Sequence, residues 1–493
     1  MKKTITNSLF IITFFSVLDR ALGFLFKIFM SRTVGAEGVG LYQIAFSFFS
    51  VLLSTVVGGI PLVVSKFVAR SQTSDNKITG SALLLALSIS ALLIGLFFAL
   101  YYPLAYAMGK TTIILVLCML PTLVFSSVYC SLRGYLWGRE KFFAVSIVEV
   151  IEQISRIGIC VAMFLMGFDK LRSIAISLSI GSLISALACF IFFFTNHGKL
   201  GASKSDFIKI AKSSFPITIS NLIGSLSGSI TSLVIPKLFV WSGYTLSQAN
   251  AMLGASVGMA MPLVYIPITL VSSLAFVLIP KISNDLKNNN YVKINASITG
   301  AIKFATLVAC CLIPFFSSCG RALCEFVYNN TQSGEYLSFI AFALIPLTVE
   351  NITGSILNSL DLEMKNFING MIGYSMLWVV AVVTIGNYSI YALGTGFALS
   401  WTLSAILNIR CIIKKTGLSL SFAPFIVKSV VLCAPTVLFS ANILGVCSSL
   451  PSIFAIIICG LSSVAFFAVL SLIFGSFTFT KICVKKSRKK AKA

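Results

Sequence analysis

Runs of about 20 consecutive apolar residues, separated by short polar breaks, follow one another along almost the whole of this 493-residue chain. A run of this length can cross the hydrocarbon core of a bilayer as a helix, in which every backbone polar group is satisfied internally. The sequence is 57% hydrophobic and only 10% charged, whereas a soluble domain carries about 25% charged residues. We therefore predict an all-α polytopic membrane protein without a sizeable soluble domain.

Fourteen of the apolar runs have the length expected of a membrane-spanning helix. The predicted spans lie at residues 8–31, 40–64, 79–103, 111–134, 142–167, 172–195, 208–238, 250–279, 296–318, 336–359, 366–388, 390–412, 425–446 and 451–476.

The distribution of Lys and Arg favours this even number of spans. With a cytoplasmic N-terminus, the cytoplasmic segments hold 26 Lys and Arg residues and the outer segments hold six. This bias follows the positive-inside rule, so we expect a multi-pass protein of the cell membrane with both termini in the cytoplasm. The same rule accounts for the net charge of +23 without a nucleic-acid partner. The basic tail at 479–493 is expected to anchor the topology, with lipid binding or regulation as the alternative.

Two distant segments of the chain look like weak copies of each other. Residues 8–38 and 214–243 have a similar pattern, and each is followed by a helix that ends in a basic residue. Internal repeats of this kind often flank a transport site. We therefore expect two six-helix lobes followed by two further helices and the tail, with bounds at 1–200, 201–415, 416–478 and 479–493.

The first predicted span contains three charged residues, Asp19, Arg20 and Lys27. A charge near the bilayer centre costs roughly 2.5–3.5 kcal/mol on insertion scales, so these residues need polar surroundings. Spacings of three and four predict one polar helix face, made of Thr13, Ser16, Arg20, Gly23, Lys27 and Ser31. This face is expected to line a water-filled cavity or to meet a partner helix. Alternatively, Asp19 forms a structural pair with Arg20 or another neighbour, which leaves Lys27 unexplained.

Two further spans carry candidate polar residues. In the fifth span a second stripe contains Ser146, Glu149, Gln153 and Arg156, with Glu152 beside it. Glu152 and Arg156 stand four residues apart, in the order that favours an ion pair on a helix. They are interpreted either as a packing pair or as part of a cavity lining. In the second lobe Glu350 is a candidate site for a coupling ion, although it has no obvious partner.

Proline and glycine within the apolar runs mark candidate hinges, because they interrupt or loosen helical hydrogen bonding. The candidates are Pro61, Gly224, Gly228 and Pro267. Gly224 and Gly228 form a G-x-x-x-G pattern, for which close packing of two helices is the alternative interpretation.

Neither catalytic motifs nor metal-binding motifs occur in the sequence. There is no P-loop or nucleophile-elbow pattern, and His197 is the only histidine. The thirteen cysteines are scattered, mostly through apolar segments, without C-x-x-C spacing, so disulfides are not expected. We therefore predict that the protein is not an enzyme and has neither a metal site nor a cofactor.

Several longer segments resemble a known family. The stretches 19–69, 131–158, 233–286 and 354–365 are similar to the stage V sporulation protein B and polysaccharide flippase branch of the multidrug/oligosaccharidyl-lipid/polysaccharide (MOP) flippase superfamily. The resemblance implies two lobes around a central cavity and alternating access. It also implies transport of an undecaprenyl-diphosphate-linked sugar from the inner to the outer leaflet.

The resemblance assigns a role to the first helix. Arg20 matches an arginine of the cationic cavity in related lipid II flippases, whereas their second arginine aligns with Phe26, next to Lys27. The regions matching the second and eighth helices lack the basic residues of those relatives, so this cavity is expected to be less basic.

The leading hypothesis is a flippase for a lipid-linked oligosaccharide or a peptidoglycan precursor in cell-envelope or spore-cortex synthesis. The expected substrate-binding residues are Ser16, Asp19, Arg20, Lys27, Glu152 and Arg156. Membrane potential, Na⁺ or H⁺ remains open as the energy source, and so does association with envelope-synthesis enzymes. The alternatives are a cation-coupled multidrug exporter, which would need intramembrane acids such as Glu350, and a membrane scaffold without transport activity.

Overall fold

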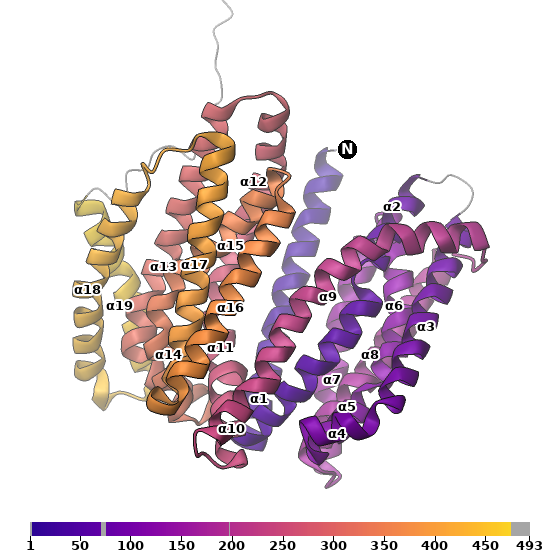
Figure 1. The fold of residues 1–493 in the computed structure, drawn as a ribbon, viewed down its shortest axis with the longest axis horizontal. Coiled ribbons are helices and arrows are strands. Elements are labelled where there is room, and N and C mark those ends of the chain that lie inside the picture. Colours follow the sequence, from indigo (N-terminus) through magenta and orange to yellow (C-terminus); the bar gives the residue numbers. More distant parts are fainter. Residues whose placement is uncertain (1, 71–74, 197, 475–493) are drawn as a thin grey trace, which may run out of the picture. The chain divides into compact units, whose positions relative to one another are not determined.

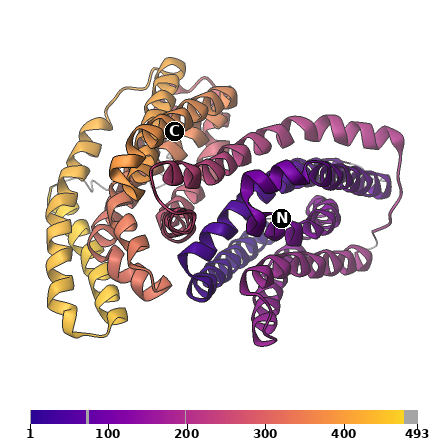
Figure 2. The ribbon, with the colours of Figure 1, turned by 60° about the horizontal axis from the view of Figure 1, so that its bottom comes forward.

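The computed structural model describes residues 2–70, 75–196 and 198–474. All the regular elements in these ranges are helices (Figures 1 and 2), which confirms the predicted all-α class. The chain divides into two compact units, an N-terminal unit that ends at Gly254 and a C-terminal unit that begins at Ala255. The lobe bounds given by the sequence stay a prediction.

Ten α-helices make up the described part of the N-terminal unit. They are α1 (Lys2–Val57), α2 (Ile60–Arg70), α3 (Asp75–Ala99), α4 (Tyr101–Met108), α5 (Lys110–Met119), α6 (Pro121–Gly138), α7 (Phe142–Leu165), α8 (Lys170–Thr195), α9 (Lys204–Trp241) and α10 (Leu246–Leu253).

A π-helical segment, Gly254–Ala260, leads into the C-terminal unit, which also contains two short 3₁₀ segments, Ala341–Ala343 and Cys447–Ser449. Its α-helices are α11 (Met261–Val264), α12 (Ile266–Lys287), α13 (Tyr291–Tyr328), α14 (Thr331–Ile340), α15 (Leu344–Ser359), α16 (Glu363–Tyr388), α17 (Ile390–Thr416), α18 (Ala423–Val446) and α19 (Ser452–Ile473).

Helix α1 joins the first two predicted spans. Its 56 residues are helical throughout except at Gly35, where φ is 67° and ψ is −177°. The polar break between the first two predicted spans is therefore a kink within one long helix. Glycine suits this position because positive φ costs it little. At 1.5 Å per residue α1 is roughly 84 Å long, far more than the ~30 Å core of a bilayer.

In the described residues, eleven helices are long and apolar enough to cross a membrane, or twelve if one bent pair is counted as a span. That count treats Phe14–Arg70 as one helix. It also leaves out α7, which carries Glu149, Glu152 and Arg156 among its apolar residues. The number of fourteen spans stays a prediction.

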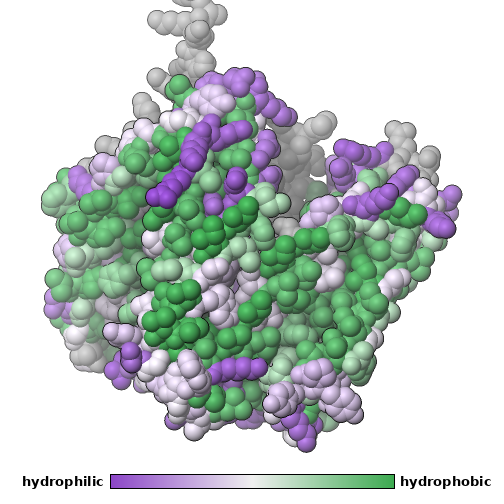
Figure 3. Space-filling model, in the orientation of Figure 1, coloured by the Kyte–Doolittle hydropathy of each residue, from purple (hydrophilic) through white to green (hydrophobic). Residues whose placement is uncertain are grey.

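Apolar side chains cover the flanks of the helices, as a bilayer requires. In Figure 3 they form broad continuous areas, and hydrophilic residues gather mainly at the helix ends. Leu92 and Leu461, for example, are each 70% exposed. In water such surfaces would be highly unfavourable, so the protein is a multi-pass membrane protein.

Helices α2 and α6 pack closely against each other. A Cβ added at Gly134 would lie 2.7 Å from the Cβ of Val64, and one at Gly138 would lie 2.7 Å from the Cβ of Val68. These glycines therefore allow the two helices to approach closely. Arg133 is the neighbour of Gly134, about 100° further round the helix, and so it faces away from this contact.

The predicted hinge residues lie in different settings. Pro61 is buried in the first turn of α2, just after the bend at Gly58 and Gly59. Pro267 lies in the first turn of α12, where the chain turns by 42° after α11. Around Gly224 and Gly228 no other atom lies within 4 Å of an added Cβ. Close helix packing therefore does not account for these two glycines here, and their role as hinges stays a prediction.

Candidate functional site

Three helices of the N-terminal unit bring polar side chains together within the apolar bundle. Helix α1 supplies one residue, α6 supplies two and α7 supplies four. We call this group the acid–arginine cluster; it consists of Asp19, Tyr129, Arg133, Glu149, Glu152, Gln153 and Arg156. All of these except Arg156 line a cavity of about 190 Å³.

Arg133 connects α6 to α7 through a short ion pair. Its Nη2 lies 2.8 Å from Glu149 Oε1, and the two side chains are 25% and 28% exposed. The same carboxylate oxygen accepts a hydrogen bond from the Tyr129 hydroxyl at 3.3 Å. The guanidinium also lies over the Trp137 ring, 4.1 Å from its centroid. These contacts hold Arg133 in place and compensate its charge.

The other arginine of the cluster pairs within α7. Arg156 Nη2 lies 2.8 Å from Glu152 Oε1, which is the ion pair that the i, i+4 spacing predicts. Arg156 Nη1 donates a hydrogen bond to Gln153 Oε1 at 3.5 Å, and Gln153 is hydrogen-bonded to the Asp19 carboxyl group. Gly23 on α1 leaves room for Gln153, whose Nε2 lies 3.9 Å from an added Cβ. The chain of contacts thus runs from α7 to α1.

The cluster largely compensates its own charges. It contains three carboxyl groups and two guanidinium groups, each guanidinium is paired with one glutamate, and Asp19 is bound to an amide. Burying an unpaired ion in a bilayer is costly, and such compensation reduces that cost. Both arginines therefore already have a structural role.

Arg20 and Lys27, unlike the two arginines of the cluster, have no acidic ion-pair partner among the described residues. Both side chains are exposed, and neither forms an ion pair with any residue in the described part of the chain. They stand seven residues apart, about 10 Å along the helix, and so lie on the same face of α1. The sequence left open whether Asp19 pairs with Arg20 or with another neighbour. Its hydrogen-bond partner is Gln153 on α7. Ser16, on the same face as Arg20, is partly buried.

Sequence reasoning missed Tyr129 and Arg133. The segment "YCSLRGYLW" lies at the end of a predicted span, so Arg133 was counted among the charges that set topology. A usable signal existed, because Tyr129, Arg133 and Trp137 recur every four residues and share one helix face. The spacing does not reveal that Glu149 faces them.

Glu350 lies on α15 of the C-terminal unit and is partly buried. Among the described residues no cation pairs with it within 4.0 Å. Its carboxyl group interacts electrostatically with the hydroxyl groups of Tyr265 and Tyr374. A role as a coupling-ion site stays a prediction.

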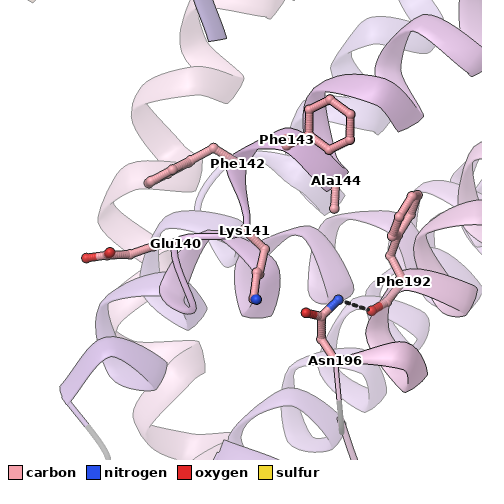
Figure 4. Close-up of a pocket in the computed structure, with 7 residues that line it drawn as sticks. All are labelled: Glu140, Lys141, Phe142, Phe143, Ala144, Phe192 and Asn196. Atoms are coloured by element: carbon pink, nitrogen blue, oxygen red, sulfur yellow. Dashed lines mark hydrogen bonds between the residues drawn. The ribbon is translucent and has the colours of Figure 1, made fainter. Parts of the chain in front are cut away.

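A second cavity, of about 280 Å³, lies where α6 turns into α7 near the end of α8 (Figure 4). Figure 4 shows the Lys141 amine pointing toward Asn196, whose amide donates a 2.8 Å hydrogen bond to the Phe192 carbonyl oxygen. The Glu140 side chain points away from both. This cavity contains none of the residues predicted from the sequence, and we assign it no role.

A double-mutant cycle measures the strength of the Arg133–Glu149 pair. Arg133→Gln and Glu149→Gln should each lower the free energy of unfolding by about 2 kcal/mol, because each leaves a poorly solvated charge without its partner. The double variant should lose clearly less than the sum of the two. The exposed pair Arg321–Glu335, with its atoms 3.9 Å apart, is the matched control and should show almost no coupling. Additive losses at Arg133 and Glu149 would show that the pair contributes nothing.

The architecture and the buried charges together define a class of protein. The chain forms two all-helical membrane units, and one of them contains a polar cluster in its interior. This arrangement is typical of a polytopic transporter. The model of a protein family described as "Polysaccharide biosynthesis protein" matches residues 5–285 of the chain. The chain belongs to this polysaccharide biosynthesis protein family, within the stage V sporulation protein B and polysaccharide flippase branch of the MOP superfamily. Its relatives are flippases and transporters, and it is not an enzyme.

Two curated proteins of Bacillus subtilis (strain 168) are similar to the chain. Stage V sporulation protein B is 25% identical over 452 residues, which cover 85% of this chain and 87% of the relative. The lipid II flippase MurJ is 24% identical over 333 residues, which cover 60% and 61% of the two chains.

Solved structures share the fold. A lipid II flippase MurJ in an inward closed conformation has a TM-score of 0.71 at 17% identity and covers 94% of this chain and 98% of its own. An inward-facing MATE family multidrug transporter of the MOP superfamily has a TM-score of 0.69 at 14% identity and covers 80% and 94%. These structures confirm the fold.

Proposed function

We propose that this protein is an alternating-access flippase. Its substrate would be an undecaprenyl-diphosphate-linked oligosaccharide or peptidoglycan precursor, which moves from the inner to the outer leaflet during cell-envelope or spore-cortex synthesis. The name of one curated relative, the lipid II flippase MurJ, and the description of the family as polysaccharide biosynthesis proteins support a lipid-linked sugar as the substrate class. The single observation that carries the proposal is the pair of exposed, unpaired cations on α1, Arg20 and Lys27.

The chemistry of these two residues suits a diphosphate. A diphosphate cannot enter hydrocarbon without partners for its negative charges. An arginine can bind it with two parallel hydrogen bonds, and a lysine can follow it as a flexible point charge. The arginines of the acid–arginine cluster are already paired with glutamates, whereas Arg20 and Lys27 remain available to a ligand. The cluster would hold α1, α6 and α7 together behind them.

The direction of transport rests on the expected topology. In the topology expected from the positive-inside rule, both termini and the segments rich in Lys and Arg lie in the cytoplasm. An inside-negative potential would then favour outward movement of an anion by about 2.3 kcal/mol per charge per 100 mV, if the charge crosses the whole field. Membrane potential is therefore our proposed energy source, and a Na⁺ or H⁺ contribution through Glu350 is the alternative.

The proposal is tested by measuring which molecule the protein moves. Cells depleted of their own lipid II flippase are supplied with the wild-type protein, and labelled undecaprenyl-diphosphate sugars are then quantified in the outer leaflet. We expect outer-leaflet label to rise well above that of cells that carry an empty vector. The export of a lipophilic cationic dye is measured in the same cells.

Each of the other outcomes would contradict the proposal. Dye export without movement of the lipid-linked sugar would identify a multidrug exporter, the function named for the MATE relative. If the protein is correctly inserted and neither molecule moves with any of the sugars tested, a non-transporting scaffold becomes the better interpretation.

A further inference from the structure

The last two helices of the C-terminal unit, α18 and α19, both pack against α13 (Figure 1). Hydroxyl groups connect the three helices in the interior. Ser440 on α18 lies 2.6 Å from Ser318 on α13 and 2.7 Å from Ser463 on α19, measured between Oγ atoms. This polar contact shows that α13, α18 and α19 meet at one point.

A pair of thiols lies beside these serines. The Sγ atoms of Cys319 on α13 and Cys459 on α19 are 2.7 Å apart, although the residues are 140 positions apart in the chain. Both side chains are fully buried. A disulfide bond is about 2.05 Å long, so the two sulfurs would need to approach by well under 1 Å to form one.

A second pair of cysteines, Cys310 and Cys433, also lies between α13 and α18 and can be compared with Cys319 and Cys459. Cys433 on α18 also faces α13, but its Sγ contacts the backbone oxygen of Cys310, at 3.8 Å. The thiols of Cys310 and Cys433 also interact, but the short contact of 2.7 Å between two Sγ atoms is the one between Cys319 and Cys459. Scattered spacing in the sequence argued against disulfides, and it gave no sign that two helices 140 residues apart would bring these thiols together.

We propose that Cys319 and Cys459 are a redox modification site, at which a two-electron oxidant joins α13 to α19 through a disulfide. In this step the two S–H bonds break and one S–S bond forms. Two electrons and two protons pass to the oxidant, which is reduced by the same two hydrogens. An azo compound, for example, becomes the corresponding hydrazine.

The surroundings of the pair favour this chemistry in two ways. Thiol oxidation proceeds through a thiolate, and the Ser440 hydroxyl, whose Oγ lies 3.2 Å from Cys459 Sγ, can donate a hydrogen bond to one. Cys459 is also only two turns from the start of α19, at the end that the predicted topology places outside the cell, where conditions are oxidising. Because both thiols are buried, the oxidant must be small and able to enter the bilayer.

The test uses the full-length protein in lipid vesicles and the small uncharged azo oxidant diamide. After treatment the protein is unfolded in N-ethylmaleimide, digested without reduction and analysed by mass spectrometry. We expect a linked peptide pair containing Cys319 and Cys459, and two fewer blocked thiols than the thirteen cysteines of the chain. Dithiothreitol should restore both thiols. The oxidised protein should also melt several degrees higher, because a cross-link restricts the unfolded chain.

Variants separate a specific bond from general oxidation. Cys459→Ala and Cys319→Ala should each abolish the linked peptide and the rise in Tm, whereas Cys310→Ala should keep both. The wild-type digest decides the result on its own, so the test does not depend on how well the variants fold. Complete blocking of Cys319 and Cys459 after prolonged treatment, both with diamide and with oxygen and copper–phenanthroline, would overturn the proposal. So would a linkage of either cysteine to a different partner.

Discussion

Replacing both Arg20 and Lys27 with Ala should lower the rate at which the lipid-linked sugar reaches the outer leaflet by about 100-fold. Each residue can make a charge-assisted hydrogen bond to a phosphate, and losing one such contact costs roughly 1.5–3 kcal/mol. The single variants should each lose about 10-fold. Arg20→Lys should lose less than Arg20→Ala, because it keeps the charge and loses only the two-pronged geometry. The measurement is outer-leaflet label per correctly inserted molecule.

The matched control for this series is Lys110→Ala, which removes an exposed cation at the start of α5, outside the acid–arginine cluster. It should transport like the wild type. Arg20 and Lys27 pair with no acid in the described part of the chain, so their removal should leave the Tm almost unchanged. Normal transport by the double variant would refute the role that we assign to these two cations.

Gly254→Ala should strongly destabilise the N-terminal unit. Helices α1 and α10 touch through their backbones at this point. A Cβ added at Gly254 would lie 1.9 Å from the Ala36 carbonyl oxygen and 2.7 Å from the Gly40 amide nitrogen. Backbone atoms of two helices cannot move aside as a flexible side chain can, so we expect a loss of about 3 kcal/mol or more in the free energy of unfolding. Thermal unfolding in detergent measures the effect.

The contact is reciprocal, which provides a second variant. A Cβ at Gly40 would lie 1.9 Å from the Asn250 carbonyl oxygen, so Gly40→Ala should be nearly as harmful. Gly300→Ala is the control, because that helical glycine has no neighbouring atom within 4 Å of an added Cβ. Alanine there should be neutral or slightly stabilising, as alanine favours helices. A Tm for Gly254→Ala equal to that of the control would show that the two helices do not meet in this way.

The helical fold could be predicted from hydropathy because a bilayer leaves the backbone few alternatives. Some details depend on single positions. Positive φ at Gly35 makes the polar break between the first two predicted spans a kink within α1, and no periodicity in the sequence distinguishes a kink from a loop. Helix α7 was predicted as a span at 142–167 in spite of its three charges, and contacts within and between helices compensate those charges.

The candidate site could be predicted only in part. Helical periodicity placed Arg20 and Lys27 on one face of α1 and paired Glu152 with Arg156, because both relationships lie within one helix. The partners of Asp19 and Glu149 are on other helices, Gln153 on α7 and Arg133 on α6. The sequence pattern of one helix does not show which other helix packs against it, or at which position along its axis the two are in contact. The small-residue contact between Gly40 and Gly254 was missed for the same reason.

The self-compensation of the acid–arginine cluster has a consequence for how such a protein can diversify. Charges that stabilise the bundle and charges that face a substrate are carried by different residues, although Asp19 and Arg20 are adjacent in the chain. Substitutions at Arg20 and Lys27 can therefore change the net charge offered to a substrate, while the Arg133–Glu149 pair and the hydrogen bond between Gln153 and Asp19 keep the helices assembled. Selectivity for a new headgroup would require changes at two positions, without rebuilding the scaffold that carries them.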